Sequence, residues 1–240
     1  MNKYDPRHDW ALRHIAYHDW MPKNMSEKQC SKLNMLRPLR AACKSCTMCN
    51  LGVIDHTHLG ERIEDYRVFS NMRPSRFVVI GQNPGYNECV QDEPFVGDAG
   101  TIFNNEITKH GIDRSMFYIT NVVKCHTPDN RKPERDEIEA CKPFIMMELK
   151  LLKPILVITL GAVAFQVLCP DRQYSDSLGK VVQSTFGVNV YPIYHPSPRN
   201  MQHPERRAKF DSDIAALCAL IKKLGLAARQ DQQSSCSTKS

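Results

Sequence analysis

The chain has 240 residues, of which 42% are hydrophobic and 24% charged, enough for one α/β domain with short extensions. No apolar run reaches the ~18 residues of a membrane span, and the polar N-terminus does not read as a secretion signal. We therefore expect no membrane association and a cytoplasmic location. The formal net charge of +6 at pH 7 suits a polyanionic partner.

Helical and strand patterns alternate along the chain after an N-terminal arm over residues 1–25. Ser26 is placed to cap the first helix. The last predicted helix carries an apolar stripe and ends at Gly225. We expect helices over 26–42, 99–110, 133–152, 161–168 and 204–225, and strands over 77–80, 117–123, 155–160 and 188–194.

This alternation predicts the α/β class, as a three-layer sandwich. A central, mainly parallel four-stranded sheet would be covered by helices on both faces. Residues 26–226 would form this domain. Residues 227–240, rich in Gln and Ser, would form a disordered tail.

Two loops directly follow predicted strands. They are Gly81-Gln82-Asn83-Pro84-Gly85 and His195-Pro196-Ser197-Pro198-Arg199-Asn200. Loops at the carboxyl ends of strands line the crevice in which an open α/β sheet binds its ligands. The sequence thus predicts one pocket with an amide on one side and an imidazole on the other.

Five of the ten cysteines suggest a metal site. Cys43, Cys46 and Cys49 are close together, and Cys125 and Cys141 follow later. Two ligands from the first group and two from the second would suit zinc or an iron–sulfur cluster. The alternative is that the later pair are buried apolar residues, although the polar neighbours of Cys125 argue against it.

Five segments between about Cys46 and Leu224 are informative through their order and spacing together. They are Cys46-Thr47-Met48-Cys49-Asn50-Leu51, Pro94-Phe95-Val96-Gly97-Asp98-Ala99-Gly100, Tyr118-Ile119-Thr120-Asn121-Val122-Val123-Lys124-Cys125, Cys141 and Leu160-Gly161. On these segments the chain resembles the uracil-DNA glycosylase superfamily, and most strongly its iron–sulfur family 4 enzymes.

The resemblance implies a structural 4Fe–4S cluster, with zinc as the alternative. Its ligands would be Cys46, Cys49, Cys125 and Cys141. Cys43 would be a bystander, because the family pattern places a leucine two residues after the second cysteine.

The first motif departs from family 4, whose glutamate is replaced by Gln82. Asn83 and the motif that begins at His195 are similar to those of the single-strand-selective monofunctional enzymes, in which asparagine positions water. The chain thus resembles a family 4 frame that carries a hybrid site.

The resemblance and the chemistry of N-glycosidic cleavage together indicate roles for the site residues. Asn83 would hold the attacking water, and His195 would donate to the uracil O2 as negative charge develops on the departing base. The alternatives are a turn-shaping asparagine and a histidine satisfied by backbone. The residues expected to bind substrate are Gly81, Gln82, Gly85, Phe95 and Asn121.

The second loop is expected to contact DNA through Ser197, Pro198, Arg199 and Asn200. Basic residues 124, 131, 132, 206, 207 and 209 would flank the groove that binds DNA. The alternative is that they are ordinary solvated surface charges. Phe95 would stack on the extruded base, and Gly85 would leave room for a 5-substituted uracil.

We therefore expect a monomeric, monofunctional DNA glycosylase of base excision repair, associated with the nucleoid when engaged on DNA. It would remove uracil or a related pyrimidine, flipped from single- or double-stranded DNA. No lysine stands where this family would form a Schiff base, so no strand cleavage is expected. The alternatives are a catalytically weak module that binds modified or single-stranded DNA and an unrelated zinc-ribbon protein.

Overall fold

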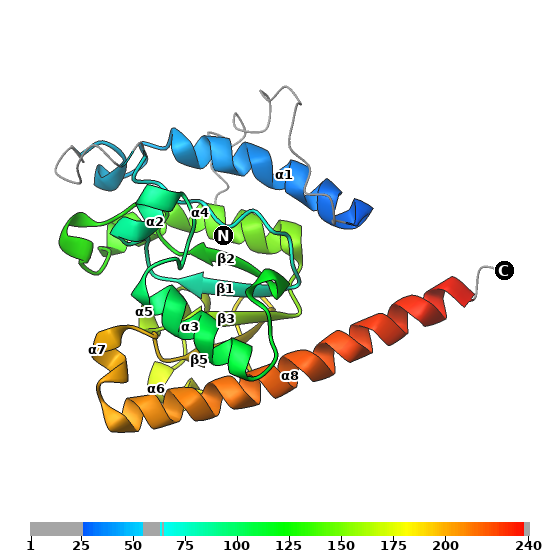
Figure 1. Cartoon of the computed structure of the whole chain (residues 1–240). Helices are drawn as coiled ribbons and strands as arrows, with labels where there is room; N and C mark the ends of the chain where they lie inside the picture. Colours follow the sequence, from blue (N-terminus) through cyan, green and yellow to red (C-terminus); the bar gives the residue numbers. More distant parts are fainter. Residues whose placement is uncertain (1–25, 55–62, 64, 238–240) are drawn as a thin grey trace.

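The computed structural model describes residues 26–54, 63 and 65–237, so the predicted N-terminal arm lies outside the described residues (Figure 1). A single sheet runs through the middle of the molecule. No helix in the described part of the chain is long and apolar enough to cross a membrane.

The sheet has five strands in the order β2-β1-β3-β5-β4. The four long ones were predicted and are parallel to one another, namely β1 (Phe77–Gly81), β2 (Phe117–Asn121), β3 (Leu156–Leu160) and β5 (Asn189–Ile193). The fifth, β4 (Val182–Gln183), pairs antiparallel with β5 and corrects the predicted count of four. Two residues are too few to show a strand periodicity.

Helices cover both faces of the sheet, which confirms the predicted class. Alternate strand residues point to opposite faces, so Val78 and Ile80 join one core while Phe77 and Val79 join the other. The first core packs against α1 (Glu27–Lys44), α4 (Arg135–Leu152) and α5 (Ala162–Leu168). The second packs against α3 (Asp98–Lys109) and α8 (Pro204–Ser237).

Short elements complete the chain. They are α2 (Tyr86–Gln91), α6 (Tyr174–Ser177), α7 (Pro198–Met201) and the single 3-10 turns η2 (Asn50–Gly52), η4 (Arg114–Met116) and η5 (Pro128–Asn130). Helix α2 directly follows β1, and α7 follows β5. Both therefore lie at the carboxyl edge of the sheet.

Helix α1 begins as the sequence predicts. Ser26 accepts from the Gln29 amide, and the Gln29 side chain accepts from the Ser26 amide, so the two form a capping box. Leu33, Leu36 and Leu39 are buried on the inner face of the helix. This packing places the chain segment that begins at Ser45 beside α4.

Helix α8 differs from the prediction at its end. Phe210, Ile214, Leu217 and Ile221 are buried, as the apolar stripe predicts, but the helix continues past Gly225 to Ser237. Glycine inside a helix costs only about 1 kcal/mol, and the residues that follow include good helix formers. The helix thus extends into the predicted tail as far as Ser237, which corrects the predicted helix end at Gly225, while the predicted disorder of residues 227–240 stays a prediction.

A buried ion pair joins the sheet to α4. Lys124 and Glu148 are each 1% exposed and are bonded to one another. The same carboxylate accepts hydrogen bonds from Tyr118 (2.6 Å) and Thr120 (3.0 Å) on β2. Lys124 therefore does not belong to the basic surface that was predicted around the site.

Candidate active site

Gly81 is the last residue of β1 and lies at the base of the site, where it pairs with Asn121 on β2. A Cβ atom at Gly81 would lie 2.4 Å from the Phe95 ring and 2.5 Å from Asn121 Oδ1. Only glycine allows this approach. The structure thus brings together three of the residues predicted to bind substrate.

Asn121 is 2% exposed, and its Oδ1 atom is buried with no hydrogen-bond partner in the described structure. An unpaired buried acceptor costs about 1–3 kcal/mol. The side chain is therefore free to bond with a ligand that enters beside Phe95.

Phe95 is held in a left-handed conformation with φ of +56°. Arg114 donates to its carbonyl oxygen at 2.9 Å and also bonds to Pro94 and Asn104. The backbone turn at Phe95 requires glycine at position 100, because a Cβ there would lie 1.9 Å from the Phe95 carbonyl oxygen. Because these contacts fix the backbone of Phe95, they also fix the position of its ring in the site.

Glu88 ties the first motif to the Phe95 loop. Its carboxylate accepts three backbone hydrogen bonds, from Gly85 (3.1 Å), Val96 (3.0 Å) and Gly97 (2.8 Å). A Cβ at Gly85 would lie 2.7 Å from Glu88 Oε2. The space predicted to be open at Gly85 is thus partly filled by this carboxylate.

Asn83 is hydrogen bonded at both ends of its amide. Its Nδ2 atom lies within bonding distance of Pro84 O (3.2 Å), Thr127 Oγ1 (3.1 Å) and Asn130 Oδ1 (3.0 Å). Its Oδ1 atom accepts from Gln82 Nε2 at 2.9 Å. The two side chains of the first motif therefore act as one hydrogen-bonded unit.

His195 lies across the site from the first motif. Its ring centroid is 6.2 Å from that of Phe95, and a Cβ at Gly161 would lie 3.2 Å from the Cβ of His195. Burial lowers the pKa of His195 to about 4, so the imidazole is neutral at physiological pH. A neutral ring still offers one N–H donor to a ligand.

The predicted DNA-contact loop forms the first turn of α7. Ser197 accepts from the Asn200 amide, while the Asn200 side chain donates to His195 O at 2.9 Å. Arg206 donates to Asn200. Pro198 and Arg199 are exposed, so this turn presents a cation beside the histidine.

Other predicted cations are paired within the protein. Arg131 bonds to the buried Glu137 with both terminal nitrogens. Arg207 pairs with Glu106 and Asp211. The basic surface around the site is consequently smaller than the sequence predicts.

The cysteines expected to bind metal gather where α1, η2, β2 and α4 meet. Cys125 and Cys141 are buried in one core, and Cys46 and Cys49 pack against it. Cys43 lies in the same core. Burial raises the pKa of Cys141 to about 12, and burial also raises the pKa of Cys49.

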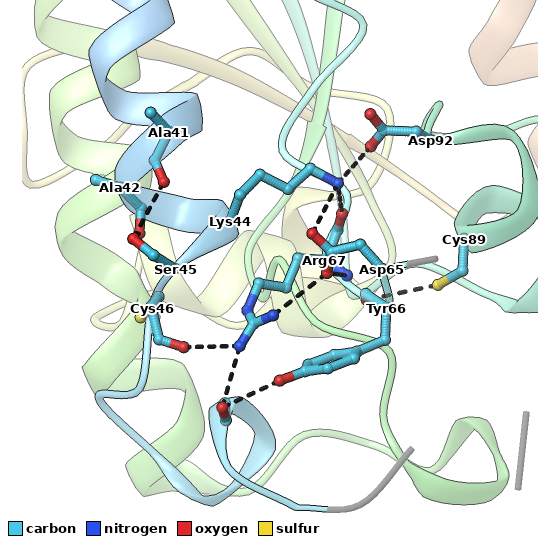
Figure 2. A network of polar contacts seen from close by, with 11 residues as sticks. Ala41, Ala42, Lys44, Ser45, Cys46, Asp65, Tyr66, Arg67, Cys89 and Asp92 are labelled. Atoms are coloured by element: carbon cyan, nitrogen blue, oxygen red, sulfur yellow. Dashed lines mark hydrogen bonds and ion pairs between the residues drawn. The ribbon is translucent and has the colours of Figure 1, made fainter. Parts of the chain in front are cut away.

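A polar network holds the cysteine loop in place (Figure 2). Arg67 donates to the carbonyl oxygens of Cys46 and Gly52, each at 3.1 Å, and its guanidinium lies over the Tyr66 ring. Lys44 bonds to Asp65 and Asp92, which connects α1 to the end of α2.

The donor chemistry of this cluster suits a thiolate-bound metal. The Lys124 amide donates to Cys141 Sγ at 3.3 Å, and because burial raises the pKa of Cys141, a bound cation would favour its thiolate. The arrangement of the side chains supports a metal site less strongly than their chemistry does. In the described part of the chain, no group of three or more His, Cys, Asp or Glu side chains is arranged to hold an ion.

Sequence reasoning missed Glu88, Arg114, Thr127 and Asn130. Glu88 had a local signal, since it stands three residues after Gly85 and completes the cap of α2. The only sequence signal near Thr127 and Asn130 is a group of turn-forming residues, and such residues do not indicate a contact with Asn83.

The chain is similar in sequence to a known protein family and to several known proteins. The sequence profile of the Uracil DNA glycosylase superfamily matches residues 69–218. A Type-4 uracil-DNA glycosylase of Pyrobaculum aerophilum is 34% identical over 146 residues, which are 58% of this chain and 74% of the relative. The Type-4 enzyme of Saccharolobus solfataricus is 36% identical over 144 residues, 55% of this chain and 66% of the relative.

The Type-4 uracil-DNA glycosylase of Thermotoga maritima is 33% identical over 186 residues, which are 76% of this chain and 92% of the relative. This chain belongs to the uracil-DNA glycosylase superfamily.

Proposed function

We propose that the protein is a monofunctional uracil-DNA glycosylase of base excision repair. It would hydrolyse the bond between uracil and deoxyribose. The observation that carries this proposal is the meeting of Gly81, Phe95, Asn121 and His195 at one edge of the sheet. They offer a stacking face, an amide and an N–H donor to one flat base.

The unpartnered Oδ1 atom of Asn121 supports uracil as the base. Uracil presents an N3–H donor beside its O4 acceptor, and a carboxamide matches this pair. Cytosine presents the opposite pattern on the same edge. Stacking on Phe95 contributes about 1–3 kcal/mol without distinguishing the two.

His195 supports departure of the base. As the C1′–N1 bond breaks, the electron pair moves onto uracil, and a neutral imidazole N–H placed at O2 stabilises that charge. One preorganised donor of this kind is worth about 3 kcal/mol. The linked amides of Gln82 and Asn83 align the water that adds to the sugar.

Arg199 supports DNA as the partner, because its exposed guanidinium stands on the turn next to His195. The nucleotide would enter flipped out of a single or double strand. We propose that the protein acts in the cytoplasm, on DNA, as a monomer.

The cysteine cluster is proposed to bind a 4Fe–4S cluster through Cys46, Cys49, Cys125 and Cys141, with a structural role outside the reaction. A brown, anaerobically purified protein with broad absorbance near ~400 nm would support it. A colourless protein that contains zinc would favour the zinc alternative.

The decisive experiment is base release from single- and double-stranded oligonucleotides that contain uracil. We expect release by the wild type and none by Asn83→Ala, with DNA affinity retained. Parallel substrates with 5-hydroxymethyluracil test whether the space beside Glu88 admits a 5-substituent.

A second candidate function is recognition of modified or single-stranded DNA without catalysis. Gln82 favours it, because a carboxamide cannot act as a carboxylate base. Tight binding to DNA with no release of any base by cluster-loaded protein would establish this alternative and overturn the first.

A further inference from the structure

The direction of the Asn83 amide is determined by its surroundings. Pro84 O can only accept a hydrogen bond, so the Asn83 group that faces it must be Nδ2. Thr127 uses its own hydrogen to donate to Arg131 O at 2.6 Å, and therefore accepts from Asn83. Reversing the amide would bring two oxygens together at Pro84.

The orientation of Asn83 determines that of Gln82. Because Asn83 Oδ1 points to Gln82, the Gln82 atom that meets it must be Nε2. The carbonyl oxygen of Gln82, Oε1, is then at the far end of that amide. The Nδ2 hydrogens of Asn83 are already shared among three acceptors.

The segment that holds Asn83 is itself held in place. His126 Nδ1 lies 2.9 Å from Pro84 O, and Thr127 is fully buried. Asp129 and Asn130 have φ of +52° and +53°. Left-handed residues in succession persist only where surrounding contacts hold them, and here they bring Asn130 Oδ1 to Asn83.

We propose that Gln82 Oε1 is the acceptor that holds the attacking water, and that Thr127, Asn130 and Asn83 are positioning residues that aim it. This inference rests on the proposed glycosylase function. The water donates one hydrogen to Gln82 Oε1 while its oxygen bonds to C1′, and the C1′–N1 electron pair leaves with the base. The proton released from the water passes to solvent, because a carboxamide is not a base.

The test compares Gln82→Met with wild type in single-turnover release of uracil and in DNA affinity. Methionine keeps the length of the side chain and removes both amide atoms. We expect the rate to fall by about 100-fold or more while the Kd for DNA changes by less than about threefold. Gln82→Met within about threefold of the wild-type rate, with Asn83→Ala inactive, would overturn the proposal.

Two pairs of variants test the positioning residues. Thr127→Val and Asn130→Ala remove the acceptors that face Asn83 and should each slow release by about 10-fold. Thr127→Ser and Asn130→Asp keep an acceptor and should restore most of the rate. Equal losses within each pair would show that these residues only support the fold.

Gln82→Glu supplies a readout that a structural role would not produce. A carboxylate at this position can take a proton from the water, so release should rise with pH as that carboxyl ionises. A glutamate ordinarily has a pKa of about 4.3, so both proteins are assayed between about pH 4 and 7. The ratio of the Gln82→Glu rate to the wild-type rate should rise over this range, because wild type has only amides beside the water. A ratio that does not change with pH would overturn the proposal, and this ratio decides if Gln82→Met does not fold.

The activity of wild type distinguishes failure of the proposed function from failure of the assignment of Gln82 Oε1 as the water-holding atom. If wild type releases no uracil, the proposed function fails. If wild type is active and Gln82→Met is equally active, only the assignment of the water-holding atom fails.

Discussion

The ring of Phe95 lies 6.2 Å from the imidazole of His195, measured between centroids, with 46° between the two planes. The two residues come from connections that follow different strands, and Gly161 lets His195 approach the sheet. A flat base stacked on Phe95 would therefore present its edge to His195. Stacking and charge stabilisation are thus supplied by different elements.

His195→Gln should lower the rate of uracil release by about 100-fold, because it removes a preorganised N–H donor at the developing charge. DNA affinity should change little, since the contact strengthens as the bond breaks. Single-turnover kinetics measure the rate. His203→Gln is the matched control, since His203 is exposed on the turn before α8. A similar loss in both variants would contradict the role of His195.

The same histidine should make stability depend on pH. Burial lowers the pKa of His195 from 6.5 to about 4, so the unfolded chain binds more protons between these values. The free energy of unfolding should therefore decrease as pH falls from 6.5 towards 4, by up to about 3 kcal/mol. Urea denaturation across this range should show a smaller decrease for His195→Gln. Parallel curves for the two proteins would refute the prediction.

Glu88→Ala should destabilise the protein by about 2–4 kcal/mol, because three backbone N–H groups lose a charged acceptor. Glu88→Gln keeps one acceptor oxygen and should cost less. Urea denaturation gives the free energies. Val90→Ala, at an exposed position of the same helix, is the control and should stay near the wild-type value. Equal stability of Glu88→Ala and Val90→Ala would mean that the three hydrogen bonds to the Glu88 carboxylate contribute nothing to stability.

Glu148→Gln should destabilise by about 3–5 kcal/mol, because it leaves Lys124 charged and unpaired in the core. Lys124→Met should cost less. Burial raises the pKa of Glu148, so the carboxyl can take up a proton once the lysine is gone. Denaturation at equal metal content compares the two. A larger loss of stability in Lys124→Met than in Glu148→Gln would contradict this account of the ion pair.

Arg199→Ala should weaken DNA binding uniformly and reduce the slope of log K against log salt by about 1. The reason is the loss of one phosphate contact on the exposed turn of α7. Binding titrations at several salt concentrations measure the slope. Arg76→Ala is the control, because Arg76 is exposed just before β1, at the opposite edge of the sheet. If both slopes stay at the wild-type value, Arg199 lies outside the interface.

The four long strands, the helix starts and the two site loops could be read from the sequence because each rests on a local pattern. Apolar runs bounded by glycine and proline mark the strands, and Ser26 marks the start of α1. Parallel strands bring their carboxyl ends to one edge, so Gly81 and His195 were expected to face each other. The cysteine spacing likewise indicated one cluster.

The tertiary structure alone decided which polar groups meet. Lys124 follows a strand like any surface lysine, but it is buried because Glu148 on α4 reaches it. Asn83 meets Thr127 and Asn130 only because β1 and β2 pair side by side, and such hydrogen bonds between distant residues leave no periodicity in the chain. Local patterns therefore determined where the site lies, and packing determined which atoms face the base and the water.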